Sequence, residues 1–389
     1  MKWEKVKLGN VCDSISDGDH QAPPKTVSGI PFVTISNINS THQFDFSDVM
    51  YVSEDYYDNL DEKRKARIGD ILYTVVGSFG IPVLIKEHKE FVFQRHIAIL
   101  RPKSCIDSRF LYYTMLSRDF YKQADAVALG AAQRTVSLTS LRNMEIELPP
   151  IETQKCIADI LSAYDDLIEN NQKQIKLLEE AARRLYKEWF VDLHFPDYEH
   201  TKIVDGVPEG WERSRLIDIA EIQYGFAFDG FLFNSAGNGT PIVRIRNIPS
   251  GTTSDYTTED ADKQYIICNG DIVVGMDGEF HINSWCDSEA YLVQRTCSIK
   301  PCNKKQKGYL FWAIYEPIKY FEKTIVGATV AHLGKKHLDS IYLLTAPETY
   351  YIPFQLFFDK RQILLNQIRH LQQSRGKLLP KLMNGEIEV

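Results

Sequence analysis

The sequence predicts an α+β protein with two β-rich domains separated by two long helices, which pair as an antiparallel coiled coil with a pseudo-twofold internal repeat. Three observations predict it. The chain repeats itself after about 200 residues, the first part of each repeat is made of short β-type runs, and the second part has a heptad pattern.

The internal repeat keeps its order along the 389 residues. Residues 3–8 (WEKVKL) return as 211–216 (WERSRL), and 29–38 (GIPFVTISNI) return as 239–248 (GTPIVRIRNI). Further matches are GDIL at 69–72 with GDIV at 270–273, Gln94-Arg95 with Gln294-Arg295, Gly130-Ala131 with Gly327-Ala328, and Leu141 with Leu338. Because the offset drifts only from 210 to 197, we interpret the chain as a tandem duplication.

The first part of each repeat has the residue pattern of a β-rich fold. Residues 31–38, 70–76 and 91–100 are alternating or β-branched runs, and Gly, Pro, Asn and Asp punctuate them. Aromatic residues at helical spacing predict short helices at 108–126 and 308–322. We therefore expect β-rich domains at residues 1–150 and 201–350.

The second part of each repeat predicts a long helix, at 151–200 with its linker and at 351–389. Apolar positions alternate by four and three residues for about five heptads, which is typical of a coiled coil. The first seam is Ile157, Leu161, Tyr164, Ile168, Asn171, Ile175, Leu178, Ala182, Leu185 and Trp189. The second seam is Leu364, Ile368, Leu371, Arg375, Leu378 and Leu382, and Pro380 should end or kink this helix.

Charge favours pairing of the two helices with each other. Residues 151–200 hold six basic and eleven acidic side chains, whereas 351–389 hold six and three. Opposite charge favours hetero-pairing. Asn171 and Arg375 are polar seam residues that fix register in one interpretation and are frayed or tilted to solvent in the other. Antiparallel pairing would set the two domains at opposite ends of a rod.

Composition excludes several classes of protein. The net charge of −7 argues mildly against non-specific coating of nucleic acid, which needs excess positive charge. The sequence has no apolar run of about 18 residues and no apolar signal-peptide core near residue 1. Seven cysteines without a CxxC pair fit reduced thiols, so we expect a cytoplasmic protein.

Several motifs resemble one known family over essentially the whole chain. They are LPPIETQ at 148–154 followed by IADIL at 157–161, LLPKLMNGEI at 378–387, DGDH at 17–20 with Pro23, the GxPxVxIxNI segment of both halves, and PEGWE at 208–212. With these motifs, the sequence is similar to specificity subunits of type I restriction–modification enzymes.

The resemblance implies a role in recognising double-stranded DNA. Each β-rich domain would be a target recognition domain that reads one half of a bipartite site, and the helical spacer would set the gap. The implied partners are modification (methyltransferase) subunits, two of them expected, and restriction/translocase subunits. S-adenosylmethionine, ATP and Mg would be bound by those partners, with none in this chain. The subunit itself would not be catalytic.

The residues agree with a non-catalytic chain. The Pro-Pro pairs at 23–24 and 149–150 follow Ala22 and Leu148, so neither has the Asn or Asp that an adenine methyltransferase motif needs. The sequence has no GxGxxG or GxxxxGK[ST] phosphate loop and no HExxH pair. We therefore expect no catalytic residues and no metal site.

The candidate DNA contacts are side chains that can donate or accept hydrogen bonds on loops and strand ends. In the first domain they are His20, Lys25, Ser36, Asn37, Ser78, Arg95, His96, Gln133 and Arg134. In the second domain they are Tyr224, Arg244, Arg246, Asn247, Gln294, Arg295, His332, Lys335 and Lys336.

These candidates have structural alternatives. Asn37 and Asn247 recur in both halves, which also fits residues that fix a turn or strand end. Gln94-Arg95 and Gln294-Arg295 recur too, which fits phosphate contact or bracing of the domain better than base reading. Lys335-Lys336 also fits a solvated helix start, and the basic run 62–67 fits a solvated or backbone-facing segment.

Two other functions stay open at this point. One is a fragment of a fused restriction/methylation enzyme whose catalytic part lies elsewhere. The other is a coiled-coil scaffold whose two β-rich domains bind protein, which the heptads and the net charge suit equally well.

Overall fold

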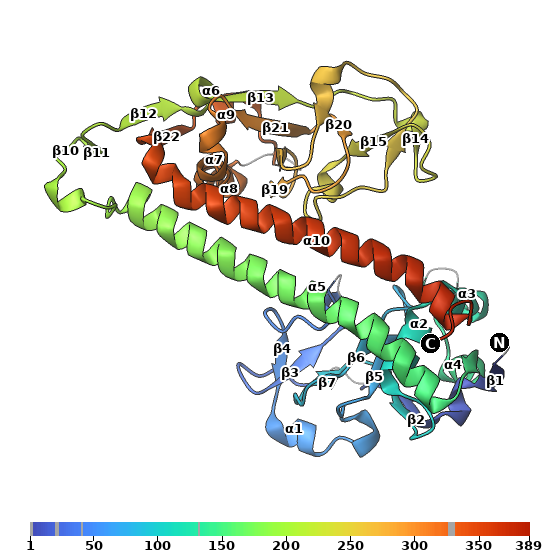
Figure 1. The fold of residues 1–389 in the computed structure, drawn as a ribbon. Coiled ribbons are helices and arrows are strands. Elements are labelled where there is room, and N and C mark those ends of the chain that lie inside the picture. The colour runs from blue at the N-terminus through green and yellow to red at the C-terminus, as the bar shows by residue number, and fades with distance from the viewer. Residues whose placement is uncertain (1–2, 20–22, 40–41, 131–132, 326–330) are drawn as a thin grey trace. The chain divides into compact units, whose positions relative to one another are not determined.

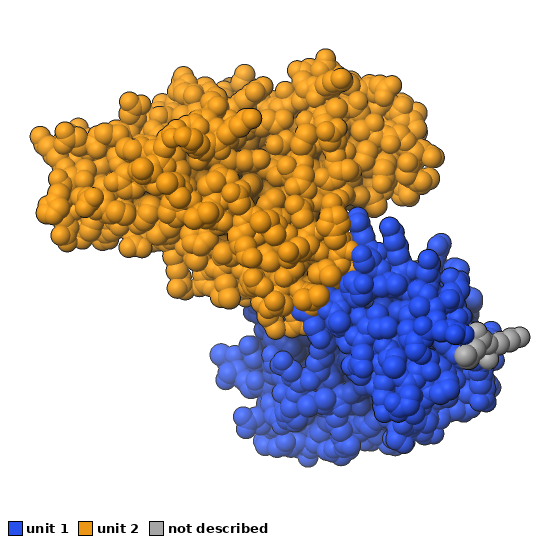
Figure 2. Space-filling model, in the orientation of Figure 1, with its two compact units in different colours: residues 1–166, 372–389 blue, residues 167–371 orange. Residues whose placement is uncertain are grey.

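The computed structural model describes residues 3–19, 23–39, 42–130, 133–325 and 331–389, and its ribbon is drawn in Figure 1. The chain divides into two compact units, coloured separately in Figure 2. Unit 1 consists of residues 1–166 and 372–389, and unit 2 consists of residues 167–371. Each long helix therefore contributes one part of its length to each unit.

The described residues of unit 1 form three small sheets. In the first, β1 (Glu4–Lys7) pairs with β9 (Glu145–Leu148). The second has the order β2 (Cys12–Asp17), β8 (Ile97–Pro102), β5 (Ile71–Thr74), β6 (Pro82–Leu84). The third has the order β4 (Met50–Val52), β3 (Ile30–Val33), β7 (Val92–Phe93), with β3 and β7 parallel. The short helices are α1 (Glu54–Asp58), α2 (Ser108–Leu116), α3 (Arg118–Val127) and α4 (Leu138–Asn143).

Unit 2 repeats this plan. The strands β12 (Glu212–Arg215) and β22 (Tyr342–Thr345) pair, and a second sheet has the order β13 (Ala220–Tyr224), β21 (Thr296–Pro301), β18 (Ile272–Gly275), β19 (Ile282–Ser284). The third has the order β14 (Phe233–Asn234), β16 (Tyr256–Thr257), β15 (Thr240–Val243), β20 (Ala290–Leu292), β17 (Ile266–Ile267). A hairpin of β10 (Ile203–Val204) and β11 (Val207–Pro208) precedes them. The short helices are α6 (Leu216–Ile219), α7 (Lys307–Ala313), α8 (Tyr315–Thr324) and α9 (Lys335–Asp339).

The internal repeat is therefore confirmed in the sheet topology, because equivalent strands pair in the same order in both units. A glutamine at the start of each long helix repeats a contact as well. Gln154 Oε1 accepts the N–H of Asp107 at 2.9 Å, and Gln355 Oε1 accepts the N–H of Gly308 at 2.9 Å. Each bond satisfies a backbone donor at the start of a short helix, which would otherwise lack a partner.

The predicted helices at 108–126 and 308–322 are confirmed, each as two consecutive helices. The first breaks at Ser117, whose hydroxyl caps α3 by accepting the N–H of Phe120 at 3.2 Å. The second divides at Ile314 between α7 and α8. None of the helices in the described part of the chain has the length and apolar character that a membrane span requires.

The long helices are α5 (Ile151–Tyr186), which continues into a π-turn at Lys187–Val191, and α10 (Ile352–Met383). None of the positions of the expected seams is exposed, and Ile157, Leu161, Ile168, Leu364, Ile368 and Leu382 are buried. Of the two effects expected of Pro380, an end of the helix at this residue is not observed. The helix continues for three residues beyond it, and Asn384 N donates to Pro380 O at 3.1 Å.

Contacts within each unit show that the two helices run antiparallel. In unit 1, Arg375 pairs with Asp165, while Leu382 lies in the same buried cluster as Ile157 and Leu161. In unit 2, Asn171 Nδ2 donates to Gln367 Oε1 at 3.2 Å, and Arg361 pairs with Glu179. Asn171 is only 7% exposed and bonds across the seam, so the register-fixing interpretation holds for it.

Both helices also complete the cores of the domains. In unit 2, Phe190 packs on Trp211 and Tyr309, with ring centroids 5.0 and 4.7 Å away, and Phe358 packs on Phe311 at 5.4 Å. In unit 1, Ile157, Ala158, Leu161 and Leu382 join Leu8, Ile71, Tyr73, Phe110 and Leu111 in one core. The aromatic residues at the helix ends therefore belong to the domains and not to a free rod.

Arg361 is the charged centre of the contact between helices and sheet in unit 2. The residue is 5% exposed, and its guanidinium donates to Glu179 Oε1 at 2.8 Å, Ser284 Oγ at 2.8 Å and Asn283 Oδ1 at 2.7 Å. It also lies over the ring of Phe311, 4.9 Å from the centroid. A buried charge is tolerated only when it is paired and hydrogen-bonded. Arg361 therefore joins α5, α10 and β19.

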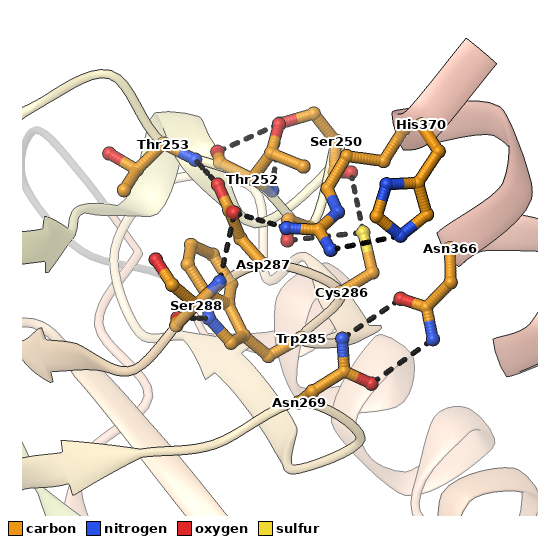
Figure 3. Close-up of polar contacts among 12 residues, drawn as sticks. Ser250, Thr252, Thr253, Asn269, Trp285, Cys286, Asp287, Ser288, Asn366 and His370 are labelled. Atoms are coloured by element: carbon orange, nitrogen blue, oxygen red, sulfur yellow. Dashed lines mark hydrogen bonds and ion pairs between the residues drawn. The ribbon is translucent and has the colours of Figure 1, made fainter. Parts of the chain in front are cut away.

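The next turns of α10 hold two loops of the same domain, one with Asn269 and one with Asp287 (Figure 3). Asn366 and Asn269 exchange hydrogen bonds of 2.8 and 3.2 Å between their amides. Arg369 Nη1 lies 2.7 Å from Asp287 Oδ1, and Asp287 Oδ2 also accepts the N–H of Thr253 at 3.4 Å. The second β-rich domain is thus attached to the helix by polar contacts over several turns.

Replacing Arg361 tests the importance of this attachment. We expect Arg361→Ala to lower the free energy of unfolding by about 3 kcal/mol or more, because Glu179, Asn283 and Ser284 lose their shared partner. Urea denaturation, with hydrogen exchange at β19 to localise the loss, measures the effect. The matched control is Arg184→Ala, whose ion pair with Glu180 is 78% and 50% exposed and should contribute less than about 1 kcal/mol. Equal losses for both variants would contradict the role of Arg361.

Candidate nucleic-acid interface

The parallel strands β3 and β7 end at the same edge of their sheet and bring two candidate segments together. Val33 is paired with Phe93, and Gln94 N donates to Val33 O at 3.2 Å. The turn Ile35–Asn37 follows β3, and Arg95-His96 follows β7. Parallel strands end on the same side, so Ser36 and Arg95 lie at one edge.

The loop that follows β2 joins this edge through a close backbone contact. A Cβ on Gly18 would lie 2.2 Å from Phe93 O, so only glycine fits there. Asp19 N donates to Phe93 O at 2.9 Å, and Arg95 N donates to Asp19 O at 3.0 Å. His20, the next candidate, lies outside the described residues.

The loop that contains Gln133 and Arg134 completes the arrangement. Gly77 has a φ of +71° and its N–H donates to Arg134 O at 2.9 Å, which places Ser78 beside the loop. Val75 N donates to His96 O at 2.9 Å, and Val75 O accepts the N–H of Val136 at 2.8 Å. We name the first recognition edge by its residues Gly18–Asp19, Ser36–Asn37, Gly77–Ser78, Arg95–His96 and Gln133–Arg134.

The second domain forms the equivalent edge. Val293 N donates to Val243 O at 3.2 Å, and a Cβ on Gly225 would lie 2.1 Å from Val293 O. Gly278, with a φ of +70°, donates its N–H to Ala331 O at 3.0 Å. The second recognition edge is formed by Gly225–Phe226, Arg244–Asn247, Asp277–Gly278, Gln294–Arg295 and Ala331–His332.

Three candidates lie outside the residues that define these edges. Lys25 is exposed and precedes Thr26, whose N–H donates to Tyr51 O in β4 at 2.9 Å. Lys335 and Lys336 are exposed at the start of α9, so the expected helix start is confirmed. Neither lysine forms an ion pair with a residue that the structure describes.

The cations of the edges differ in their partners. Arg95 is exposed and has no ion pair within the described residues, whereas Arg134 pairs with Asp125 and lies over Phe79, 5.3 Å from the ring centroid. In the second domain Arg246 Nε donates to Asp255 Oδ2 at 3.1 Å, and Arg244 lies over Phe233 at 5.5 Å. Among the described arginines of the edges, Arg134, Arg246 and Arg295 are paired with carboxylates, whereas Arg95 and Arg244 are not.

His96 is held in a partly buried position. One ring nitrogen lies 2.7 Å from Gln94 Nε2. Burial lowers the pKa of His96 below its usual value, and the charge of Arg95 acts in the same direction. The neutral imidazole is therefore favoured near pH 7, so this side chain offers hydrogen bonds and not a positive charge.

Asn37 and Asn247 use their amides inside the fold. Asn37 Oδ1 accepts the N–H of Thr34 at 2.9 Å and its Nδ2 donates to Asp48 O at 3.0 Å. Asn247 is 9% exposed, accepts the N–H of Arg244 at 2.8 Å and donates to Asp255 Oδ2 at 3.2 Å. These bonds favour the structural interpretation, and DNA contact by either side chain stays a prediction.

Tyr224 is placed with its ring against the core of unit 2. Its hydroxyl is buried without a hydrogen-bond partner among the described residues, and burial raises the pKa of the phenol to about 12. Gln294 is exposed, and its backbone N–H donates to Phe226 O at 2.7 Å. The placement of Tyr224 favours a structural role, while Gln294 is accessible.

Sequence reasoning missed residues that the fold brings to the edges. Arg64 lies 4.0 Å from Asp17 and 3.9 Å from Asp19, and the hydroxyl of Tyr56 donates to Asp19. The basic run 62–67 was the one available signal for Arg64, and no spacing rule links it to β2.

Among the residues that the structure describes, no group of three or more His, Cys, Asp and Glu side chains is placed to hold a metal ion. The described parts of the two edges instead present single cations, amides, hydroxyls and glycine turns. Such groups bind phosphates and base edges.

The family described as "Type I restriction modification DNA specificity domain" matches residues 1–180 and 208–347. The chain belongs to this family. The match lies on both halves of the repeat, and it includes both recognition edges.

Relatives in this family extend along the whole chain. The MjaIX specificity subunit of Methanocaldococcus jannaschii is 27% identical over 308 residues, covering 74% of this chain and 71% of the relative. A putative MjaX specificity subunit of the same organism is 24% identical and covers 100% of this chain and 94% of the relative. The crystal structure of a type I system S subunit from M. genitalium has the same fold, with a TM-score of 0.59, 17% identity and coverage of 98% and 96%.

The role of Asn247 can be tested by stability. We expect Asn247→Ala to lower the free energy of unfolding by about 1–3 kcal/mol, because Arg244 N loses its acceptor inside the turn. Urea denaturation measures the change. Asn238→Ala is the control, since that exposed side chain should contribute less than about 0.5 kcal/mol. An unchanged stability for Asn247→Ala would contradict the structural interpretation.

Proposed function

We propose that the chain is the DNA-binding specificity subunit of a type I restriction–modification system. Each recognition edge reads one half of a bipartite site in double-stranded DNA, and the paired helices set the gap between the halves. The observation that carries the proposal is the repeated edge. Two copies of one backbone arrangement present different side chains at equivalent positions, inside a family of DNA specificity domains.

Some side chains are identical at equivalent positions of the two recognition edges and others differ, which supports recognition of two different half-sites. Gln94-Arg95 and Gln294-Arg295 are the same in both copies and end equivalent strands. By contrast, Thr34 and Ser36 stand where Arg244 and Arg246 stand in the second domain. Residues that contact the DNA backbone can be identical in both domains, because the backbone carries no sequence information. Residues that contact bases must differ when the half-sites differ.

The chain acts in this proposal as a non-catalytic targeting subunit. The adenine methylation and the ATP-dependent cleavage belong to partner subunits, which would bind S-adenosylmethionine, ATP and Mg. The names of the relatives, which are specificity subunits, support this division of labour. A fused enzyme fragment or a protein-binding scaffold would not direct a separate modification subunit to methylate a bipartite site.

The outer faces of the helices offer surface for partners. In unit 2, Leu356 and Ile363 on α10 are 65% and 51% exposed, and Leu167 and Leu177 on α5 are 51% and 65% exposed. Large apolar side chains that recur on a surface mark interaction sites more often than chance exposure does. We propose that modification subunits, two of them, bind along these helices and that restriction/translocase subunits join the complex.

The charge balance predicts weak binding by the subunit alone. Residues 1–150 hold 18 basic and 19 acidic side chains, and residues 201–350 hold 15 and 19. Several edge cations are already paired with carboxylates. Non-specific affinity for DNA rises with the number of free cations that release counterions. The proposed subunit therefore depends on its partners to hold the duplex.

The deciding experiment is to co-express the chain with a modification subunit and to map adenine methylation by single-molecule sequencing. We expect one asymmetric site with two defined halves and a fixed gap. Gel shifts with that site should be tight for the complex and weak for the chain alone. Methylation without a split site, or none above that of the modification subunit alone, would reject the proposal.

The salt dependence of binding identifies phosphate contacts. If Lys336 holds a phosphate, Lys336→Ala in the complex should lower the slope of log Kd against log salt by about 0.9 for every DNA sequence. Arg134→Ala should lower it by less, because Asp125 already compensates that charge. Lys304→Ala, an exposed lysine outside the edges, is the control. An unchanged slope for Lys336→Ala would remove it from the interface.

The spacer can be lengthened without altering the contacts of either unit. Adding one heptad after Asp166 in α5 and one after Leu371 in α10 extends the helix pair by about 10 Å, or roughly three base pairs of DNA. We expect methylation mapping to show a longer gap with both halves unchanged. Seven residues added after Asp205, in the β10–β11 turn, form the control, which should keep the original gap. A gap that does not respond to the added heptads would contradict the role of the helices.

A further inference from the structure

The internal repeat allows one position of the second recognition edge to be compared with its counterpart. Val76 precedes Gly77 and pairs with Thr135, while Asp277 precedes Gly278 and pairs with His332. The two glycines have almost the same φ, +71° and +70°. Asp277 is therefore an acidic side chain on the backbone position that holds valine in the first domain.

Asp277 is held between Arg295 and His332 of the edge. Its Oδ2 lies 2.9 Å from Arg295 Nη1, and its Oδ1 lies 2.5 Å from His332 Nδ1. The side chains of Asp277, Arg295 and His332 are 25%, 55% and 48% exposed. A Cβ added to the neighbouring Gly278 would meet nothing within 4 Å, so the described surface is open beside the cluster.

Both members of the Asp277–Arg295 pair retain hydrogen-bonding capacity. Only Nη1 of Arg295 is engaged with described residues, which leaves Nη2 and Nε to donate. A carboxylate has about four acceptor positions, and the contacts with Arg295 and His332 occupy three of them. The pair therefore presents one carboxylate acceptor of Asp277 next to the Nε and Nη2 donors of Arg295.

This chemistry suits a base edge better than a phosphate. A carboxylate repels phosphate and reduces the positive charge that Arg295 would otherwise offer. Arg95, at the equivalent place in the first domain, has no carboxylate partner within the described residues and so keeps its full charge for the DNA backbone. In the major groove, cytosine presents the N4 donor, and guanine presents O6 and N7 as acceptors.

Building on the proposed function, we infer that Asp277 and Arg295 together read one G·C base pair of the second half-site in the major groove. The Asp277 carboxylate accepts from cytosine N4, and Arg295 donates to guanine O6 or N7. The first domain has Val76 at the place of Asp277, so this reading is specific to the second half-site.

The test is methylation mapping with the assembled modification complex that carries Asp277→Asn. We expect the second half-site to become degenerate at one G·C position, with a loss of preference of roughly ten-fold or more, while the first half-site is unchanged. Asp218→Asn is the matched control. It breaks an exposed Arg215–Asp218 pair of the same domain that lies on α6, outside the recognition edge, and should leave both halves unchanged.

Arg295→Lys provides a second variant if Asp277→Asn does not assemble. Lysine keeps the positive charge but lacks the planar set of guanidinium donors, so the preference for G·C at the same base position should decrease. A wild-type second half-site without a G·C pair would overturn the inference, and so would unchanged specificity in the assembled variants. Absence of any split site for the wild-type complex would instead reject the proposed function itself.

Discussion

An apolar seam that runs the length of a helix must be covered, and in this chain the β-rich domains and the other long helix cover it. Neither helix has a core of its own, and most helical stability in proteins comes from packing an apolar face against other elements. The pairing is fixed at polar points as well as apolar ones, by Asp165 with Arg375 in unit 1 and by Glu179 with Arg361 in unit 2. The β-rich domains are completed by this pair, because residues of both helices fill their cores.

The duplication has a direct physical consequence for recognition. The backbone of each edge is specified by close approaches that only glycine allows, at Gly18 and Gly225, and by parallel strands that end side by side. Such a backbone holds its shape while the side chains on it change. Two copies can therefore recognise different sequences, as a bipartite and asymmetric site requires.

Carboxylates limit the positive charge of both edges. Asp125, Asp255 and Asp277 each pair with an arginine that would otherwise face the solvent alone. This arrangement reduces attraction to any DNA and leaves hydrogen-bonding geometry as the basis of choice between sequences. The near-neutral charge of each β-rich region is thus compatible with a specific reader that works inside a larger complex.

The sequence by itself determined the features that rest on repetition. The duplication, the β-rich texture and the two seams could be predicted, because each signal recurs over many residues and one irregular position such as Pro380 does not erase it. The general location of the edges followed from turn residues at equivalent places. Only the tertiary structure decided which side chains are free. His332 meets Asp277 from 55 residues away, and Arg361 meets Glu179 from 182. Such contacts depend on how loops and helices pack in space, and no local period in the chain encodes them.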